Sequence, residues 1–105
     1  MDKAAVLEIV RRFKLALERS GVPVSKVLLF GSYTTGTYNE NSDVDVVVIS
    51  EAFKGLNHWQ RIERMTDALY AVFQPIEARP LTPEEWDSDE SMTAAYAKTS
   101  TLIPV

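Results

Sequence analysis

The strongest indication of chemistry in this chain is a pair of aspartates, Asp43 and Asp45, at the start of an apolar and β-branched run. Side chains two residues apart in a strand point to the same face, so the two carboxylates are expected side by side at a strand end. Carboxylates that close repel each other unless a positive charge lies between them, and a divalent metal ion with oxygen ligands can supply that charge. The simpler interpretation is two acids that close a loop. Against it stands Asp45, which lies inside the run, where an unpaired carboxylate is costly to bury.

A second feature is the pair Gly31-Ser32, which ends an earlier apolar run a short loop before the aspartates. Glycine lets the backbone approach a ligand closely, and the N–H groups of such a turn can bind a phosphate. The pair alone is weak evidence, because Gly-Ser ends many strands. Beside the two aspartates it predicts chemistry on a metal-bound nucleotide.

A third acid, Glu77, lies between the apolar residues Ile76 and Ala78. If its strand neighbours that of the aspartates, Glu77 approaches the same site. Three carboxylates around two magnesium ions suit phosphoryl or nucleotidyl transfer. The alternative is a glutamate of an edge strand that faces water.

Other polar and aromatic residues are assigned more ordinary roles. The only histidine, His58, is expected at the surface, and one histidine with no cysteine argues against a zinc site or a Ser-His-Asp triad. Several cations could meet a triphosphate or simply be solvated: Lys54, Arg61, Arg64 and Arg79. Several aromatic residues could stack on a base, meet a partner or pack inside: Tyr33, Tyr38, Trp86 and Tyr96.

The elements that must position these residues follow from periodicity and caps. Apolar spacing predicts a helix over 3–20 and another over 57–73, the second with an inward stripe from Trp59 to Phe73. In the first helix Leu15 lies outside the apolar stripe, either as a lone exposed leucine or as a partner contact. Strands are expected over 26–30, 43–50 and 75–79, the second of them central and covered on both faces. Shorter elements are a helical turn after Ser32, helices from Thr82 and over 91–98, and a terminal strand or loose end over 102–105. The order helix-strand-turn-strand-helix-strand predicts an α/β (α+β) fold, a small mixed sheet covered by helices.

Composition sets the outer bounds. The 105 residues, 46% of them hydrophobic, fit a single domain over 1–105. The absence of cysteine and of a signal peptide favours the cytoplasm, and no apolar run is long enough to span a membrane. A net charge of −4 argues against direct binding to nucleic acid. Whether the chain forms a homo-oligomer is left open.

Taken together, these residues resemble the minimal nucleotidyltransferases of the DNA polymerase beta superfamily. The matching segments, in the family's order, are Phe30-Gly31-Ser32, Ser42-Asp43-Val44-Asp45 and Ile76-Glu77-Ala78. The resemblance covers nearly the whole chain and implies a nucleotidyltransferase fold. It is the combination of segments that is specific, since each one alone is common.

The resemblance also implies roles and partners. Asp43, Asp45 and Glu77 would hold two Mg²⁺ ions, and Glu77 would help to activate the attacking hydroxyl. Gly31 and Ser32 would hold the triphosphate of the incoming nucleotide. The hydroxyl attacks the α-phosphorus and pyrophosphate leaves. Many members of the family resemble antitoxins paired with a small helical partner of the HEPN ribonuclease type, and some transfer AMP from ATP to that partner.

The leading hypothesis is therefore an ATP-dependent and magnesium-dependent transfer of AMP to a hydroxyl of a HEPN-type toxin by its antitoxin. Two alternatives remain open at this stage. The chain can be a catalytically degenerate antitoxin that acts by binding alone, because residues 33–42 contain no lysine or arginine to hold a triphosphate. It can also be a small-molecule nucleotidyltransferase, although little of the chain is left to bind such an acceptor.

Overall fold

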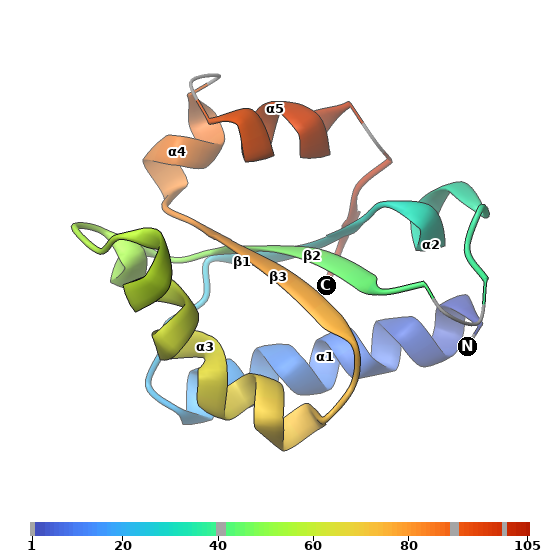
Figure 1. Ribbon diagram of the computed structural model, residues 1–105, viewed down its shortest axis with the longest axis horizontal. Helices are drawn as coiled ribbons and strands as arrows, with labels where there is room; N and C mark the ends of the chain where they lie inside the picture. Colours follow the sequence, from blue (N-terminus) through green and yellow to red (C-terminus); the bar gives the residue numbers. More distant parts are fainter. Residues whose placement is uncertain (1, 40–41, 89–90, 100) are drawn as a thin grey trace.

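A four-stranded mixed sheet forms the centre of the computed structural model, which describes residues 2–39, 42–88, 91–99 and 101–105 (Figure 1). The spatial order of the strands is β3-β2-β1-β4. Their bounds are Lys26–Phe30 for β1, Val44–Ile49 for β2, Ile76–Leu81 for β3 and Ile103–Pro104 for β4. β2 runs parallel to β3 and antiparallel to β1, which is also antiparallel to β4.

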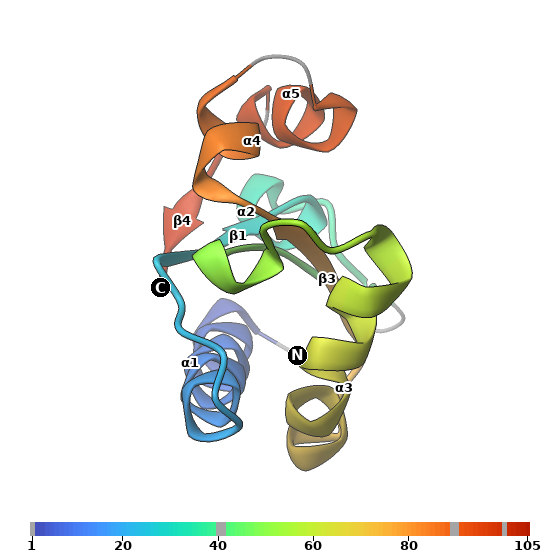
Figure 2. The same cartoon turned by 90° about the vertical axis from the view of Figure 1, so that its left-hand side faces the viewer.

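Helices cover both faces of this sheet. α1 (Lys3–Arg19) and α3 (His58–Val72) lie against one face, and α4 (Pro83–Asp87) and α5 (Met92–Lys98) lie over the other (Figures 1 and 2). A four-residue helix, α2 (Ser32–Thr35), follows β1, and a 3₁₀ turn, η1 (Glu51–Phe53), follows β2. Within the described ranges, no helix is both long and apolar enough to cross a membrane.

The alternation of side chains along β2 explains why two cores form. Val44, Val46 and Val48 join the larger core, which includes the buried stripe of α1. Val47 and Ile49 point the other way, into a smaller core under α5. The prediction of a central strand covered on both faces is confirmed.

Side-chain caps fix where the helices begin. Asn57 and Gln60 form a reciprocal capping box at the start of α3, and Thr82 and Glu85 form another at the start of α4. Each box satisfies two backbone N–H groups that have no partner inside the helix. The predicted starts of both helices are therefore confirmed, and α4 also has a proline in its first turn, where a missing N–H costs no hydrogen bond.

Some predicted boundaries differ from the structure by a residue or two. α1 ends at Arg19, with Ser20 as its cap. β2 begins at Val44, which leaves Asp43 in the preceding connection. β3 extends to Leu81, past the predicted end at 79, because its parallel register with β2 continues to the pair Ile49 and Leu81. The terminal segment, for which two alternatives were open, forms the short strand β4.

The predicted inward stripe of α3 is wrong at its two aromatic ends. The side chain of Trp59 is 76% exposed and that of Phe73 is 83% exposed. Trp59 lies in the first turn of the helix, and Phe73 follows its last residue with a left-handed backbone, φ 52°. A left-handed residue departs from the helical phase, so the periodicity of α3 no longer sets the direction of its side chain.

Candidate active site

The sheet topology gathers the Gly-Ser turn and two of the predicted acids at one edge. β1 ends where β2 and β3 begin, because β1 is antiparallel to β2 and β3 is parallel to it. In the register, Asp45 pairs with Phe30 on one side and with Glu77 on the other. Gly31 directly follows Phe30. The site therefore lies at the end of the sheet beside α2, on the right in Figure 1.

The same alternation decides which face the acids occupy. Asp45 shares a face with Val47, which packs in the smaller core on the α4 and α5 side. Along β3, Ile76 and Ala78 pack against the larger core. The alternating residues Glu77 and Arg79 therefore point together to the opposite face. The carboxylates thus lie on the face opposite to α1 and α3.

Asp45 and Glu77 interact strongly. The pKa of Asp45 is raised to about 6, first by burial and then by the negative charge of Glu77 and a hydrogen bond with its side chain. The positive charge of Arg79 opposes the shift, and Asp43 makes a smaller contribution that raises the pKa. Ionisation of Asp45 is therefore unfavourable beside Glu77, and a bound cation would relieve it.

Arg79 supplies part of the balancing charge. Its Nη2 donates to Oε1 of Glu77 at 3.0 Å, and its buried Nε has no hydrogen-bond partner in the described part of the chain. The sequence suggested Arg79 only as a solvated cation or a contact for a triphosphate, and the pairing with Glu77 was missed. Their spacing of two residues within a strand, which puts both side chains on one face, was the signal that could have found it.

Gly31 fits against Asp45 in a way that no other residue type could. Its backbone has φ 81° and ψ −152°, a region that residues with a Cβ essentially avoid. A Cβ atom at this position would lie 2.5 Å from Oδ2 of Asp45. The carbonyl of Gly31 accepts hydrogen bonds from the N–H and the hydroxyl of Thr34, at 3.0 and 2.7 Å. The turn therefore packs directly onto the carboxylate, with Ser32 as the first residue of α2.

The acidic side chains are of the type that binds the predicted Mg²⁺, although the three of them do not form a preformed cluster. Carboxylate oxygens are the ligands that Mg²⁺ prefers, and the adjacent Asp45 and Glu77 supply a donor set of that kind. Asp43 is exposed in the connection before β2. In the described ranges, no three histidine, aspartate or glutamate side chains already form a metal cluster. The structure thus brings two of the three predicted acids together, with Asp43 in the adjoining connection.

The other candidate residues lie outside this pair or are engaged elsewhere. His58 is exposed, as expected. Arg61 pairs with Glu85 at 2.6 Å. Tyr33 is buried and stacks on Tyr38, with ring centroids 4.6 Å apart. Phe30, the strand partner of Asp45, forms an aromatic pair beside the acids. Its ring meets the ring of Tyr96 edge to face, with the two centroids 6.2 Å apart.

Solved structures share this architecture. A "putative nucleotidyltransferase" from Sulfolobus solfataricus superposes with a TM-score of 0.72 at 19% identity, covering 95% of this chain and 80% of that one. A second "putative nucleotidyltransferase" gives a TM-score of 0.61 at 22% identity, covering 90% and 96%. A chain from a toxin-antitoxin structure with AMP-PNP gives 0.57 at 22% identity, covering 88% and 68%. At these identities the similarity establishes the fold, which is that of nucleotidyltransferases.

The sequence places the chain within a family. Residues 10–89 match the family described as "Nucleotidyltransferase domain", so the chain belongs to it. It is homologous to two proteins named as adenylyltransferases. One is the "Putative protein adenylyltransferase MJ0141" of Methanocaldococcus jannaschii, 36% identical over 54% of this chain and 59% of that protein. The other is the "Protein adenylyltransferase MntA" of Shewanella oneidensis, 32% identical over 52% and 41%. The chain thus spans about half the length of the curated relatives it matches.

Proposed function

We propose that this protein transfers AMP from ATP to a hydroxyl group of a partner protein, in a reaction that requires Mg²⁺. The observation that carries the proposal is the pair Asp45 and Glu77, adjacent in the register of two parallel strands and in contact with the Gly31 turn. The two homologues named as protein adenylyltransferases support AMP as the transferred group and a protein as the acceptor.

Each residue of the site has a task in this proposal. Asp45 and Glu77 hold the metal, and Asp43 joins them from the exposed connection. A bound divalent ion supplies neutralisation of the charge that develops on the attacking and leaving oxygens. Glu77, on the outer strand of the three, accepts the proton of the acceptor hydroxyl. On the opposite side of Asp45, the backbone of Gly31 packs against the carboxylate, and the turn formed by Gly31 and Ser32 holds the triphosphate of the nucleotide.

The partner that we propose is a small helical toxin of the HEPN ribonuclease type, with this chain as the cytoplasmic antitoxin. The similarity of fold to a chain of a toxin-antitoxin structure with AMP-PNP supports a toxin-antitoxin pairing, and the HEPN type of the toxin follows from the resemblance of the sequence to minimal nucleotidyltransferases. Modification of a hydroxyl on the toxin would then be the act that silences it.

The test is label transfer from ATP in a lysate of the native host, with magnesium present. Wild-type protein should label one protein band from α-labelled ATP and none from γ-labelled ATP, because pyrophosphate leaves. The double variant Asp43→Asn/Asp45→Asn should lose the label. The exposed Glu18 of α1 and Glu63 of α3 provide a matched control, since Glu18→Gln/Glu63→Gln also removes two carboxylates but leaves the site intact. Equal labelling by the wild type and the double variant would refute the mechanism.

A second candidate function is silencing of the toxin by binding alone. Two observations favour it: residues 33–42 contain no lysine or arginine, and Arg79, the cation at the acids, is already paired with Glu77. In that case the double variant should still bind and silence the toxin. Neither the wild type nor the double variant should release pyrophosphate from ATP.

A further inference from the structure

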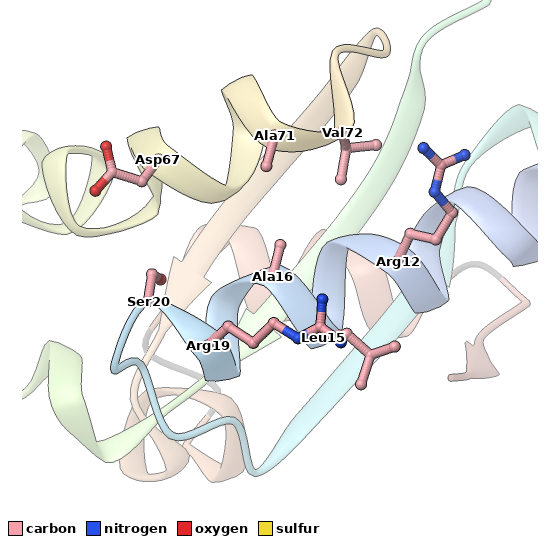
Figure 3. Close-up of a pocket in the computed structure, with 8 residues that line it drawn as sticks. All are labelled: Arg12, Leu15, Ala16, Arg19, Ser20, Asp67, Ala71 and Val72. Carbon is pink, nitrogen blue, oxygen red and sulfur yellow. The ribbon is translucent and has the colours of Figure 1, made fainter.

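A groove between α1 and α3 lies in the layer opposite to the acids and has no task in the proposed reaction. Its volume is about 430 Å³. Figure 3 shows Ala16 of α1 and Ala71 of α3 pointing toward each other across it, with charged side chains along both helices. The carboxylates point to the other face of the sheet, so a molecule bound in this groove leaves the site uncovered.

The charges of the groove are unevenly divided. The α1 wall carries Arg12 and Arg19, and the α3 wall carries Asp67. All three side chains are exposed, and none forms an ion pair within the described ranges. The groove therefore separates opposite charges that a third body lying between them could satisfy on both sides.

An apolar residue lies between the two arginines. Leu15 is 51% exposed and lines the groove one helical turn from Arg12 and from Arg19. The groove is also lined by Ala16, Ala71 and the buried Val72, which supply small or apolar surface. Together these residues give the groove an apolar strip bordered by charge, which matches a segment that presents both apolar and charged side chains.

The charge of α1 as a whole distinguishes it from the rest of the molecule. It carries five of the eleven lysines and arginines of the chain but only two glutamates, in a protein whose net charge is −4. In a two-fold contact, two copies of the chain would bring four groove arginines against only two copies of Asp67, so part of the positive charge would be left without a partner. A nucleic acid would leave the apolar floor unused and bring phosphates near Asp67. An acidic protein helix fits both the charge and the floor.

We propose that the α1/α3 groove, defined by Arg12, Leu15, Arg19, Asp67 and Ala71, docks an amphipathic helix of the partner protein. The helix presents carboxylates to the two arginines, an apolar side chain to Leu15 and Ala71, and a lysine or arginine to Asp67. A groove between two packed helices accepts a third helix laid along it. The existence of a partner protein rests on the proposed function, whereas the chemistry of the docking helix rests on the groove.

The first experiment locates the occupant. A photo-crosslinking amino acid in place of Ala71 is activated in an extract of the native host, and the crosslinked peptide is sequenced by mass spectrometry. We expect a peptide of another protein with aspartates or glutamates along one side of a helix. A crosslink to a second copy of the chain, a crosslink to nucleic acid, or no crosslink above that of the unmodified protein would each overturn the proposal.

The second experiment tests the charges with that purified protein. Arg12→Glu/Arg19→Glu should weaken binding at least tenfold, as loss of close charge pairs does. The control is Lys3→Glu/Lys26→Glu, which changes the net charge equally at two exposed positions outside the groove. This control should change the affinity for the partner protein less than about twofold, which is about the scatter between equivalent surface variants. Reversing the facing acids of the partner to lysine should restore binding to the arginine variant. Equal losses in both double variants, or no rescue, would refute the assignment.

The two proposals fail in different ways. Asp45→Asn should abolish AMP transfer and leave the crosslink at Ala71 unchanged, because the site and the groove lie on opposite faces. The groove variant should raise KM for the acceptor protein and leave KM for ATP unchanged. If the wild-type protein crosslinks through Ala71 to a partner but transfers no AMP, the proposed reaction alone is refuted. If it transfers AMP but gives no such crosslink, the docking helix alone is refuted.

Discussion

Replacement of the central acid, Asp45→Asn, should stabilise the metal-free protein even though it removes a proposed metal ligand. Burial and the charge of Glu77 raise the pKa of Asp45 from 3.8 to about 6. A group whose pKa is raised on folding contributes stability below its unfolded pKa, and that contribution is lost as the pH rises through the folded value. At a pH well above 6, the folded protein therefore carries an unfavourable ionised carboxylate that asparagine lacks.

The size of the effect follows from the shift. A shift from 3.8 to about 6 corresponds to about 3 kcal/mol at full value. Asp45 is only partly buried, so screening by solvent reduces this figure to about 1–2 kcal/mol. Asp45→Asn should exceed the wild type by that amount in free energy of unfolding at about pH 8 in EDTA, and the gap should shrink toward zero near about pH 4.

Urea unfolding followed by tryptophan fluorescence and circular dichroism measures this difference. The exposed Asp67 of α3 provides the control, because Asp67→Asn removes one charge away from the acids. Addition of MgCl₂ at high pH should stabilise the wild type and leave Asp45→Asn unchanged, which narrows or reverses the gap. An Asp45→Asn protein no more stable than the wild type in EDTA, or a gap independent of pH, would refute the reasoning about the carboxylate pair.

Three further perturbations have defined outcomes. Gly31→Ala should destabilise the fold by about 2–3 kcal/mol in urea unfolding, because it adds left-handed strain and a Cβ 2.5 Å from a carboxylate oxygen; an unchanged midpoint would contradict this. Phe73→Asn should stabilise it by about 1 kcal/mol in the same assay, since asparagine tolerates φ 52° and the phenylalanine ring is 83% exposed; a loss of stability would show that the ring packs. For Glu85, burial opposes ionisation, but hydrogen bonds from a backbone N–H and from Arg61 prevail and lower the pKa below 4.5. The stability that Glu85 contributes should be lost as the pH falls below 4.5, so acid titrations of the wild type and Glu85→Gln should converge, and parallel curves would contradict the assignment.

Much of the fold could be predicted because local signals agree with the tertiary structure. The capping residues Asn57 and Thr82 fixed two helix starts, and the valines of β2 indicated a strand buried on both faces. Trp59 and Phe73 were misplaced because periodicity assumes that a helix is covered along its whole length. Both residues lie at the ends of α3, where local backbone geometry and the extent of the sheet decide burial.

The site was predictable in part for a related reason. Strand alternation and the family resemblance were enough to single out Asp45, Glu77 and Gly31 as candidates. The contact between Asp45 and Glu77, however, depends on a parallel register between strands that α3 separates in sequence. The sequence contains no direct measure of that register. The pairing of Glu77 with Arg79 was available from spacing, whereas the separated charges of the α1/α3 groove depend on how the two helices pack.

The most direct test of the central claim is a double-mutant cycle on AMP transfer. Rates of transfer from α-labelled ATP are measured with magnesium for the wild type, Asp45→Asn, Glu77→Gln and the double variant. If the two acids act as one metal-dependent unit, each single change should lower the rate about 100-fold or more, and the double change should cost little beyond either single one. A Glu77→Gln protein that retains wild-type activity would contradict the claim that this pair forms the transfer site.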